Sequence, residues 1–267
     1  MRLIPLLCLS AVAASAHAET RFQRLVSEGH TRSAASATRG AAPVYETGFE
    51  ASEGYTLGDL DSQLGWEALL AEVVDDALPA PLAGHAARIT PDGFGPGDFG
   101  EAFRAFTPEF GVVTLDLVFD ELATKRGAVP NSSVIVFGGD LDPVHAIGFD
   151  VSSMEISAIT SFVSPPVFVG TFQFGVPVSL RLENLGDGRQ RVFINGNNVV
   201  DAPSLAAMDG AADTPSDSIV VDADSMIVTF DNIRFDQANQ CEADLDGNGT
   251  VDSSDLAIVL AGWGGCP

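Results

Sequence analysis

Apolar and polar residues alternate with a period of two through the middle of this chain, and this limits the folds available to it. The clearest runs are Val113 to Phe119, Val178 to Leu182 and Val192 to Ile194. Because successive side chains of a strand point to opposite faces, each run places one face in a core and the other in water. Turn residues such as Gly186-Asp187-Gly188 and Asn195-Gly196 separate the runs. The pattern predicts an all-β, two-sheet antiparallel sandwich.

The predicted order of elements sharpens this expectation. Short helices are expected only near Leu69 to Asp76 and Ser204 to Met208. The expected strands are an opening strand Tyr45 to Glu50, then Gly54 to Gly58 and Gln63 to Trp66, a late hairpin Val178 to Val200, and a last strand Thr229 to Phe235. This order resembles the concanavalin A-like jelly rolls of laminin-G-type and glucanase-type modules. The resemblance implies that the first and last strands pair.

The amino terminus has the pattern of an export signal. Met1-Arg2 is a short basic region, Leu3 to Ala14 is apolar, and Ala16-His17-Ala18 is a cleavage site, so residues 1–18 are predicted to be a secretory signal peptide. Residues 19–42 are predicted to be a flexible linker, residues 43–237 the sandwich, and residues 238–267 a separate tail. We expect a secreted protein, extracellular or attached to a cell surface, without a transmembrane segment.

The charge of the chain is strongly negative. It contains 37 acidic and 13 basic residues, which gives a formal charge of −24. A surface of this kind repels phosphate backbones, so nucleic acid is excluded as a partner.

The most specific chemical motif lies in the tail. Residues 244–255 place oxygen-bearing side chains at the spacing of an EF-hand calcium loop, with Gly249 at its sharp turn. The predicted Ca²⁺ ligands are Asp244, Asp246, Asn248, Thr250, Asp252 and Asp255. Cys241 and Cys266 bracket this loop. An even pair of cysteines in an exported protein is interpreted as a disulfide, the alternative being two free thiols.

Residues 241–267 resemble a single dockerin repeat. No helix-forming segment precedes the loop, and Asp255-Leu256 followed by an apolar helix matches that family, whose modules usually carry two repeats. The closing residues 261–267 resemble the GC-type tails of secreted bacterial proteins. The resemblance implies attachment to a cell-surface or scaffold component. The predicted partner-binding residues are Ser253, Ser254, Leu256, Val259, Leu260 and Trp263.

A second calcium site is implied by the jelly-roll resemblance. Related jelly rolls often bind an ion where the first and last strands meet. Glu46 or Glu50 with Asp231 would supply the ligands. The alternation of apolar and polar residues along the last strand is interrupted at Asp231-Asn232, which predicts a local bulge there.

Catalytic patterns are incomplete. Asp116 and Asp120 share a strand face, but the other carboxylates of the glucanase motif are missing. His85 and His145 are interpreted as satisfied or surface histidines. An aromatic stretch, interpreted mainly as core, contains Phe94, Phe99, Phe103, Phe106 and Phe110, and Trp66 is expected in a strand.

The sequence leaves three functions open. The first is a secreted glycan-binding or adhesive protein without enzymatic activity, with polysaccharide as a partner. The second is a surface-attached carbohydrate-active hydrolase or lyase, and the third is a structural component of the cell envelope. A groove containing two nearby carboxylates would favour the second.

Overall fold

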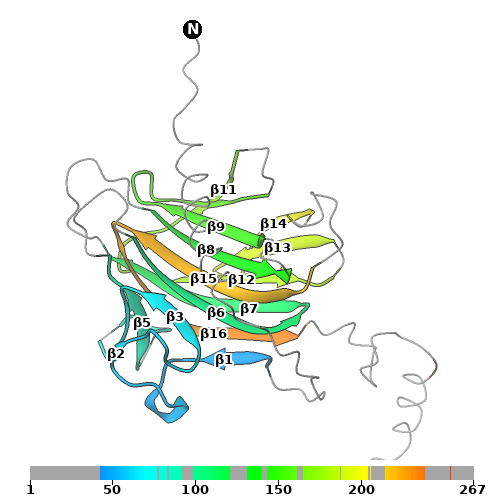
Figure 1. Cartoon of the computed structure of the whole chain (residues 1–267). Helices are drawn as coiled ribbons and strands as arrows, with labels where there is room; N and C mark the ends of the chain where they lie inside the picture. The colour runs from blue at the N-terminus through cyan, green and yellow to red at the C-terminus, as the bar shows by residue number, and fades with distance from the viewer. Residues whose placement is uncertain are drawn as a thin grey trace, which may run out of the picture.

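The computed structural model describes residues 43–76, 78–82, 84–91, 99–120, 131–139, 143–160, 165–186, 188–203, 205, 214–237 and 253. The described residues form an all-β sandwich of two antiparallel sheets, which confirms the predicted fold class (Figure 1). No helix within these residues is long and apolar enough to cross a membrane. Except for Ser253, which is exposed, the tail and all of its predicted ligands and cysteines lie outside the described residues.

Sheet A contains nine strands. Their order is β14 (Asn197–Pro203), β13 (Arg189–Ile194), β12 (Val178–Asn184), β7 (Gly111–Asp120), β16 (Ile227–Gln237), β5 (Ala86–Ile89), β4 (Ala71–Val74) and β2 (Gly58–Asp59), and β1 (Tyr45–Thr47) also pairs with β16. The first and last strands therefore pair, as expected, with Glu46 opposite Arg234.

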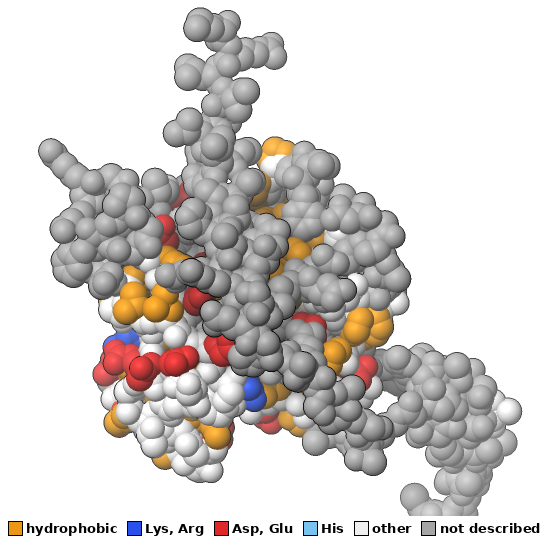
Figure 2. Space-filling view, viewed as in Figure 1, with side chains coloured by type: hydrophobic (Ala, Val, Ile, Leu, Met, Phe, Trp, Pro, Cys, Tyr) orange, Lys and Arg blue, Asp and Glu red, His pale blue; other side chains and the backbone are white. Residues whose placement is uncertain are grey.

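Sheet B contains seven strands. Their order is β11 (Val167–Thr171), β10 (Glu155–Ala158), β9 (Pro143–Asp150), β8 (Asn131–Gly138), β15 (Ser216–Asp224), β6 (Phe99–Glu109) and β3 (Trp66–Leu69). A 3-10 turn, η1 (Ala51–Glu53), follows β1. Figure 2, viewed from the same side as Figure 1, shows Asp and Glu side chains dispersed among polar and apolar ones on the described surface.

The core lies between the sheets and follows the alternation in the sequence. On β7, Val113, Leu115, Leu117 and Phe119 are buried, whereas Thr114 and Asp116 lie on the outer face of sheet A. Trp66 is 1% exposed and donates from Nε1 to the hydroxyl of Tyr55 at 3.0 Å. A buried indole N–H needs such a partner, so this hydrogen bond allows the tryptophan to lie in the core.

The turn between β13 and β14 confirms the hairpin prediction. Asn195 and Gly196 have φ values of 49° and 79°. Two consecutive residues with positive φ form the turn that matches the twist of antiparallel strands.

The helix predicted near Leu69 to Asp76 is wrong. This stretch contains the end of β3 and all of β4, separated at Leu70 by a bend with φ 54°. Beyond the bend, Ala71 and Val73 face the core and Glu72 is exposed. Over so few residues, apolar side chains that alternate along two strands joined by a bend have nearly the spacing of apolar side chains on one face of a helix. Of the helix expected at Ser204 to Met208, only Leu205 is described.

The strands expected at Gly54 to Gly58 and Gln63 to Trp66 are mostly turns. Only β2, which begins at Gly58, and the first residue of β3, Trp66, form strand within them. Residues with positive φ, including Gly54, Ser62 and Leu64, account for this difference, because extended strands require negative φ.

Candidate functional site

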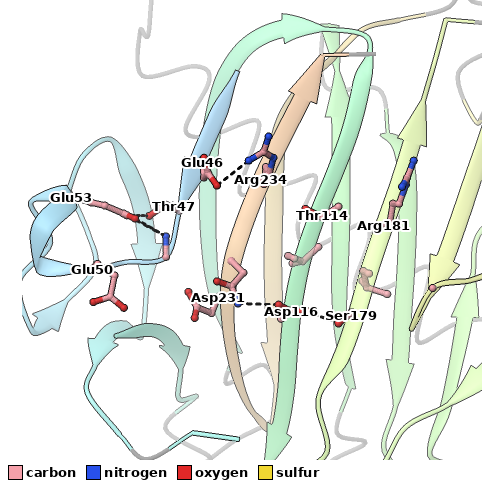
Figure 3. Close-up of a pocket in the computed structure, with 15 residues that line it drawn as sticks. Glu46, Thr47, Glu50, Glu53, Thr114, Asp116, Ser179, Arg181, Asp231 and Arg234 are labelled. Atoms are coloured by element: carbon pink, nitrogen blue, oxygen red, sulfur yellow. Dashed lines mark hydrogen bonds and ion pairs between the residues drawn. The ribbon is translucent and has the colours of Figure 1, made fainter. Parts of the chain in front are cut away.

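An open hollow of about 580 Å³ lies on the outer face of sheet A (Figure 3). The hollow opens beside β16, at the point where the strand that pairs with one edge of β16 changes from β5 to β1. Val228 to Phe230 pair with β5, and Ile233 to Phe235 pair with β1. Asp231 and Asn232 lie between these two partners. The pairing of β16 with β7 shifts register between Asp231 and Arg234, and Asn232 has φ 53°. The predicted bulge is therefore confirmed, and it positions the hollow.

Two rows of polar side chains cross the hollow. In the first row, Arg181 on β12, Thr114 on β7, Arg234 on β16 and Glu46 on β1 are successive cross-strand neighbours. In the second row, Asp116 lies between Ser179 and Asp231. Neighbouring strands are about 4.8 Å apart, so each row presents several hydrogen-bonding groups across a few strands.

Both oxygens of Asp116 accept hydrogen bonds. Ser179 donates its hydroxyl to Oδ1, and the Asn232 side-chain amide donates to Oδ2 at 3.0 Å. Asn232 also donates to the carbonyl oxygen of Pro81 at 3.2 Å. These bonds fix the carboxylate of Asp116 in the floor of the hollow.

The two arginines of the first row are held by carboxylates. Arg181 donates from Nε to Glu183 at 2.8 Å, and its guanidinium lies 5.3 Å from the ring centre of Phe193. Arg234 donates to Asp236 at 2.6 Å and to Glu46 at 3.1 Å. Because a guanidinium has five N–H donors, both arginines keep the capacity to bind a further acceptor.

Three carboxylates surround Gly48 at one end of the hollow, and we call Glu50, Glu53 and Asp231 the carboxylate cluster. Oε2 of Glu53 accepts from the Thr47 hydroxyl at 2.7 Å, and its Oε1 accepts from the Gly48 amide at 3.0 Å. Oε1 of Glu50 accepts from the His85 amide at 3.2 Å. In Figure 3 these carboxylates lie around the start of the loop that follows β1.

Asp231 is the buried member of the cluster. It is 1% exposed, and its Oδ1 has no hydrogen-bond partner among the described residues. Its pKa is raised from 3.8 to about 7, chiefly by burial and also by the nearby carboxylates of Glu50, Asp116 and Glu53, while the hydrogen bond from the Asn232 backbone opposes the change. The cluster therefore concentrates negative charge around one uncompensated oxygen.

The predicted second calcium site is only partly assembled. The structure brings Glu50 and Asp231 together, but Glu46 turns to Arg234 instead. In the described parts of the chain, no group of three or more His, Cys, Asp or Glu side chains is arranged to hold a metal ion. The predicted second calcium site therefore stays a prediction. Glu53 was missed because only the turn η1 brings it back to Gly48.

Other sequence candidates lie apart from the hollow. Asp120 is at the far end of β7, and Phe106 packs on the core. Phe94 lies outside the described residues, whereas Phe99 and Phe103 are half-buried on β6, and Phe110 is half-buried just after it. His145 is not on the surface: its side chain is 1% exposed on β9, and burial lowers its pKa from 6.5 to about 4.

A second buried carboxylate lies on sheet B. Asp222 on β15 accepts from the amide and the hydroxyl of Ser133 at 2.8 and 2.6 Å. Burial raises its pKa to about 6, although these bonds oppose the change. Its cross-strand neighbours are Ser133 and Glu101. Because its oxygens accept hydrogen bonds from Ser133 on β8, the side chain of Asp222 links the central strands β15 and β8.

Comparisons with known proteins identify the fold but not a family. No protein-family model matches the chain, and no curated protein matches it. Among solved structures, a sialidase has a TM-score of 0.50 at 10% identity, over 75% of this chain and 19% of the sialidase. A conserved carbohydrate esterase of the Shiga toxin-encoding bacteriophage phi24B has a TM-score of 0.50 at 15% identity, over 73% of this chain and 98% of the esterase. The expected jelly-roll sandwich of the concanavalin A type is therefore the fold of this chain.

Proposed function

We propose that this chain is a secreted, non-enzymatic protein that binds glycans in the hollow on the outer face of sheet A. The observation that carries the proposal is the pair of cross-strand rows, in which guanidinium, hydroxyl and carboxylate groups occupy fixed positions on adjacent strands. Sugar hydroxyls both donate and accept hydrogen bonds, so a surface that offers both kinds of partner suits them. The names of the sialidase and the carbohydrate esterase that share the fold support a carbohydrate ligand.

The state of the two aspartates in the hollow favours binding over catalysis. Both oxygens of Asp116 already accept hydrogen bonds, and Asp231 is 1% exposed. A nucleophilic carboxylate and a general acid must both reach the scissile bond of the sugar. Here the carboxylate of Asp116 is held by hydrogen bonds to Ser179 and Asn232, and the carboxylate of Asp231 is buried.

The experiment is a glycan-array screen of residues 19–267, followed by calorimetry with the best ligand. Asp116→Ala removes the acceptor in the centre of the hollow and should weaken binding by about tenfold or more, since hydrogen bonds to charged groups contribute about 1.5–3 kcal/mol. The matched control is Asp120→Ala on the same strand, outside the hollow, which should bind like the native protein. No glycan binding at all, or equal losses in both variants, would refute the proposed site.

We propose further that the tail attaches the protein to a cell-surface or scaffold component through a calcium-stabilised, dockerin-like unit. The support is the loop pattern of residues 244–255 and the cysteine pair that brackets it. A peptide of residues 238–267 should bind Ca²⁺ in calorimetry and gain helix on binding. Asp244→Ala or Asp255→Ala should weaken that binding, whereas a peptide equally helical in chelator would contradict the proposal.

A further inference from the structure

Among the described residues, arginines lie on only one of the two outer faces of the sandwich. Those on the outer face of sheet A are Arg88, Arg181, Arg189, Arg191 and Arg234. Arg104 on β6 is opposite the core residues Trp66 and Ile219, so it belongs to the inner side of sheet B. The strands of sheet B therefore carry neither arginine nor lysine on their outer face.

Carboxylates, in contrast, are spread over the outer face of sheet B. They are Glu67 on β3, Glu101 on β6, Asp222 and Asp224 on β15, Asp150 on β9 and Glu155 on β10. Asp222 is directly opposite Glu101, and Asp150 is directly opposite Glu155. Like charges in directly opposed positions destabilise a sheet. A positively charged cover over this face would offset that cost.

An apolar row crosses the same face beside the carboxylates. Phe103, Val220, Ile135 and Ala146 are successive cross-strand neighbours on β6, β15, β8 and β9. Val220 is 3% exposed and Ile135 is 8% exposed, although the outer face of a two-layer sandwich has no third layer to cover it. Leu205 packs against Ile135 and Ala146, but Val220 belongs to neither of the two apolar clusters that the described residues form. The burial of Val220 therefore calls for a further covering segment.

Residues 19–42 have the composition that complements this face. Only two of these residues are acidic, whereas the segment contains four of the 13 basic residues of the chain, namely Arg21, Arg24, Arg32 and Arg39. Phe22, Leu25 and Val26 lie beside the first two arginines. One short stretch thus offers both positive charge and apolar contact.

The segment also ends in the right place and is long enough. It leads directly into β1, where the guanidinium of Arg104 on β6 lies 5.1 Å from the ring centre of Tyr45, so the chain enters the fold beside sheet B. The outer face from β6 to β10 spans about 20 Å at about 4.8 Å per strand. Residues 19–42 would reach about 80 Å when fully extended, so they can round the edge of the sheet and cross this face.

We propose that residues 19–42 dock on the outer face of sheet B, with their arginines paired to its carboxylates and Phe22, Leu25 and Val26 placed on its apolar row. The stretch that the sequence predicts to be a linker would then be a strap that closes one side of the sandwich. The hollow on sheet A stays open, so this inference does not depend on the proposed glycan binding.

Subtilisin digestion of the mature protein, residues 19–267, tests the proposal, with mass spectrometry to follow the loss of residues 19–42. Cleavage near Phe22, Leu25 and Val26 requires the segment to leave the face, so its rate reports the undocked fraction. Four weak, exposed ion pairs acting together should slow cleavage about tenfold at about 20 mM salt relative to about 500 mM, because salt screens them. The free peptide of residues 19–42 corrects for the effect of salt on the protease.

Variants on both sides of the contact identify the face. Glu101→Gln combined with Asp224→Asn removes two carboxylates from sheet B and should speed cleavage at low salt by about threefold or more. The matched control, Glu72→Gln combined with Asp120→Asn, removes two carboxylates from sheet A and should be cleaved like the native protein. Replacing all four arginines of the segment by glutamine should abolish the protection, whereas replacing them by lysine should retain it.

Four results would overturn the inference. The first is cleavage of the native segment at low salt as fast as that of the free peptide. The second is protection that survives both high salt and the change on sheet B, which would mean that the segment is held elsewhere. The third is an equal gain in cleavage in the control on sheet A. The fourth is a native protein that is dimeric by light scattering while its segment is cleaved freely, which would assign the face to a second copy of the chain.

Discussion

Replacing Asp231 with asparagine should make stability less sensitive to pH. The pKa of Asp231 is raised from 3.8 to about 7 by burial and by its carboxylate neighbours, so the folded state holds a proton that the unfolded chain has released between these values. A proton bound only by the folded state makes the free energy of unfolding fall by about 1.4 kcal/mol per pH unit over that interval, or about 4 kcal/mol in all. Water in the open hollow screens the neighbouring charges, so we expect a loss of about 2–4 kcal/mol.

Asparagine has nearly the same shape, carries no charge, and can donate its amide to the neighbouring carboxylates. The variant should therefore match the native protein near about pH 4 and exceed its stability by about 2–4 kcal/mol near about pH 8. Urea denaturation at several pH values in chelator measures the difference directly. Taking the difference between the two proteins cancels the titration of all other groups.

Two results would refute this reasoning. One is a native protein that gains stability relative to the variant as pH rises, which would mean that Asp231 is stabilised as an anion. The other is a constant difference at all pH values, which would mean that its proton is not retained on folding. Repeating the titration in millimolar Ca²⁺ separates these causes, because an ion held by Asp231 would stabilise only the native protein.

Further predictions concern the core, the division of the chain and the site. His145→Met should make the free energy of unfolding less sensitive to acid. The pKa of His145 is lowered from 6.5 to about 4, so the stability that the neutral histidine provides is complete above about pH 6.5 and is lost as pH falls towards 4. Urea denaturation of both proteins at several pH values measures this difference. Trp66→Ala should cost about 3–5 kcal/mol in urea denaturation, because it empties the largest fully buried position, and a loss below about 1 kcal/mol would contradict that packing. A chain ending at Gln237 should unfold cooperatively with β-type circular dichroism, and a molten product would contradict the division between sandwich and tail. Asp222→Asn should raise stability above about pH 6 by leaving a neutral group bonded to Ser133, and unchanged urea midpoints would contradict its raised pKa.

The local features of the fold follow from the sequence because neighbouring residues determine them. On β7, alternation assigns Leu115 and Leu117 to the core and Thr114 and Asp116 to the outer face, as the structure has them. The turn at Asn195-Gly196 and the bulge at Asp231-Asn232 were likewise predictable, since turn chemistry and a break in apolar phase are local signals.

The two polar rows of the site could not be predicted, because they depend on which strands become neighbours. Asn232 and Asp116 are 116 residues apart in the chain, yet they share a hydrogen bond. Neither segment contains a local signal that β7 lies between β12 and β16, or that sets the register in which these strands pair. The resemblance placed Glu46 and Glu50 near Asp231, but it could not reveal that Arg234 draws Glu46 away. A shared strand face is readable from sequence, whereas a cross-strand partner is a property of the whole sheet.

The position of β16 has a mechanical consequence. This strand pairs with β7 on one side and with β5 and then β1 on the other, and it leads directly into residues 238–267. If the tail is the anchor and a ligand is held in the hollow, tension between them runs along β16 from Asp231 and Arg234 to its end. Antiparallel hydrogen bonds lie perpendicular to the strand, so a pull in this direction loads them together in shear and does not open them one at a time. The path of the load is a few residues of one interior strand, and the remainder of the sandwich bears little of it.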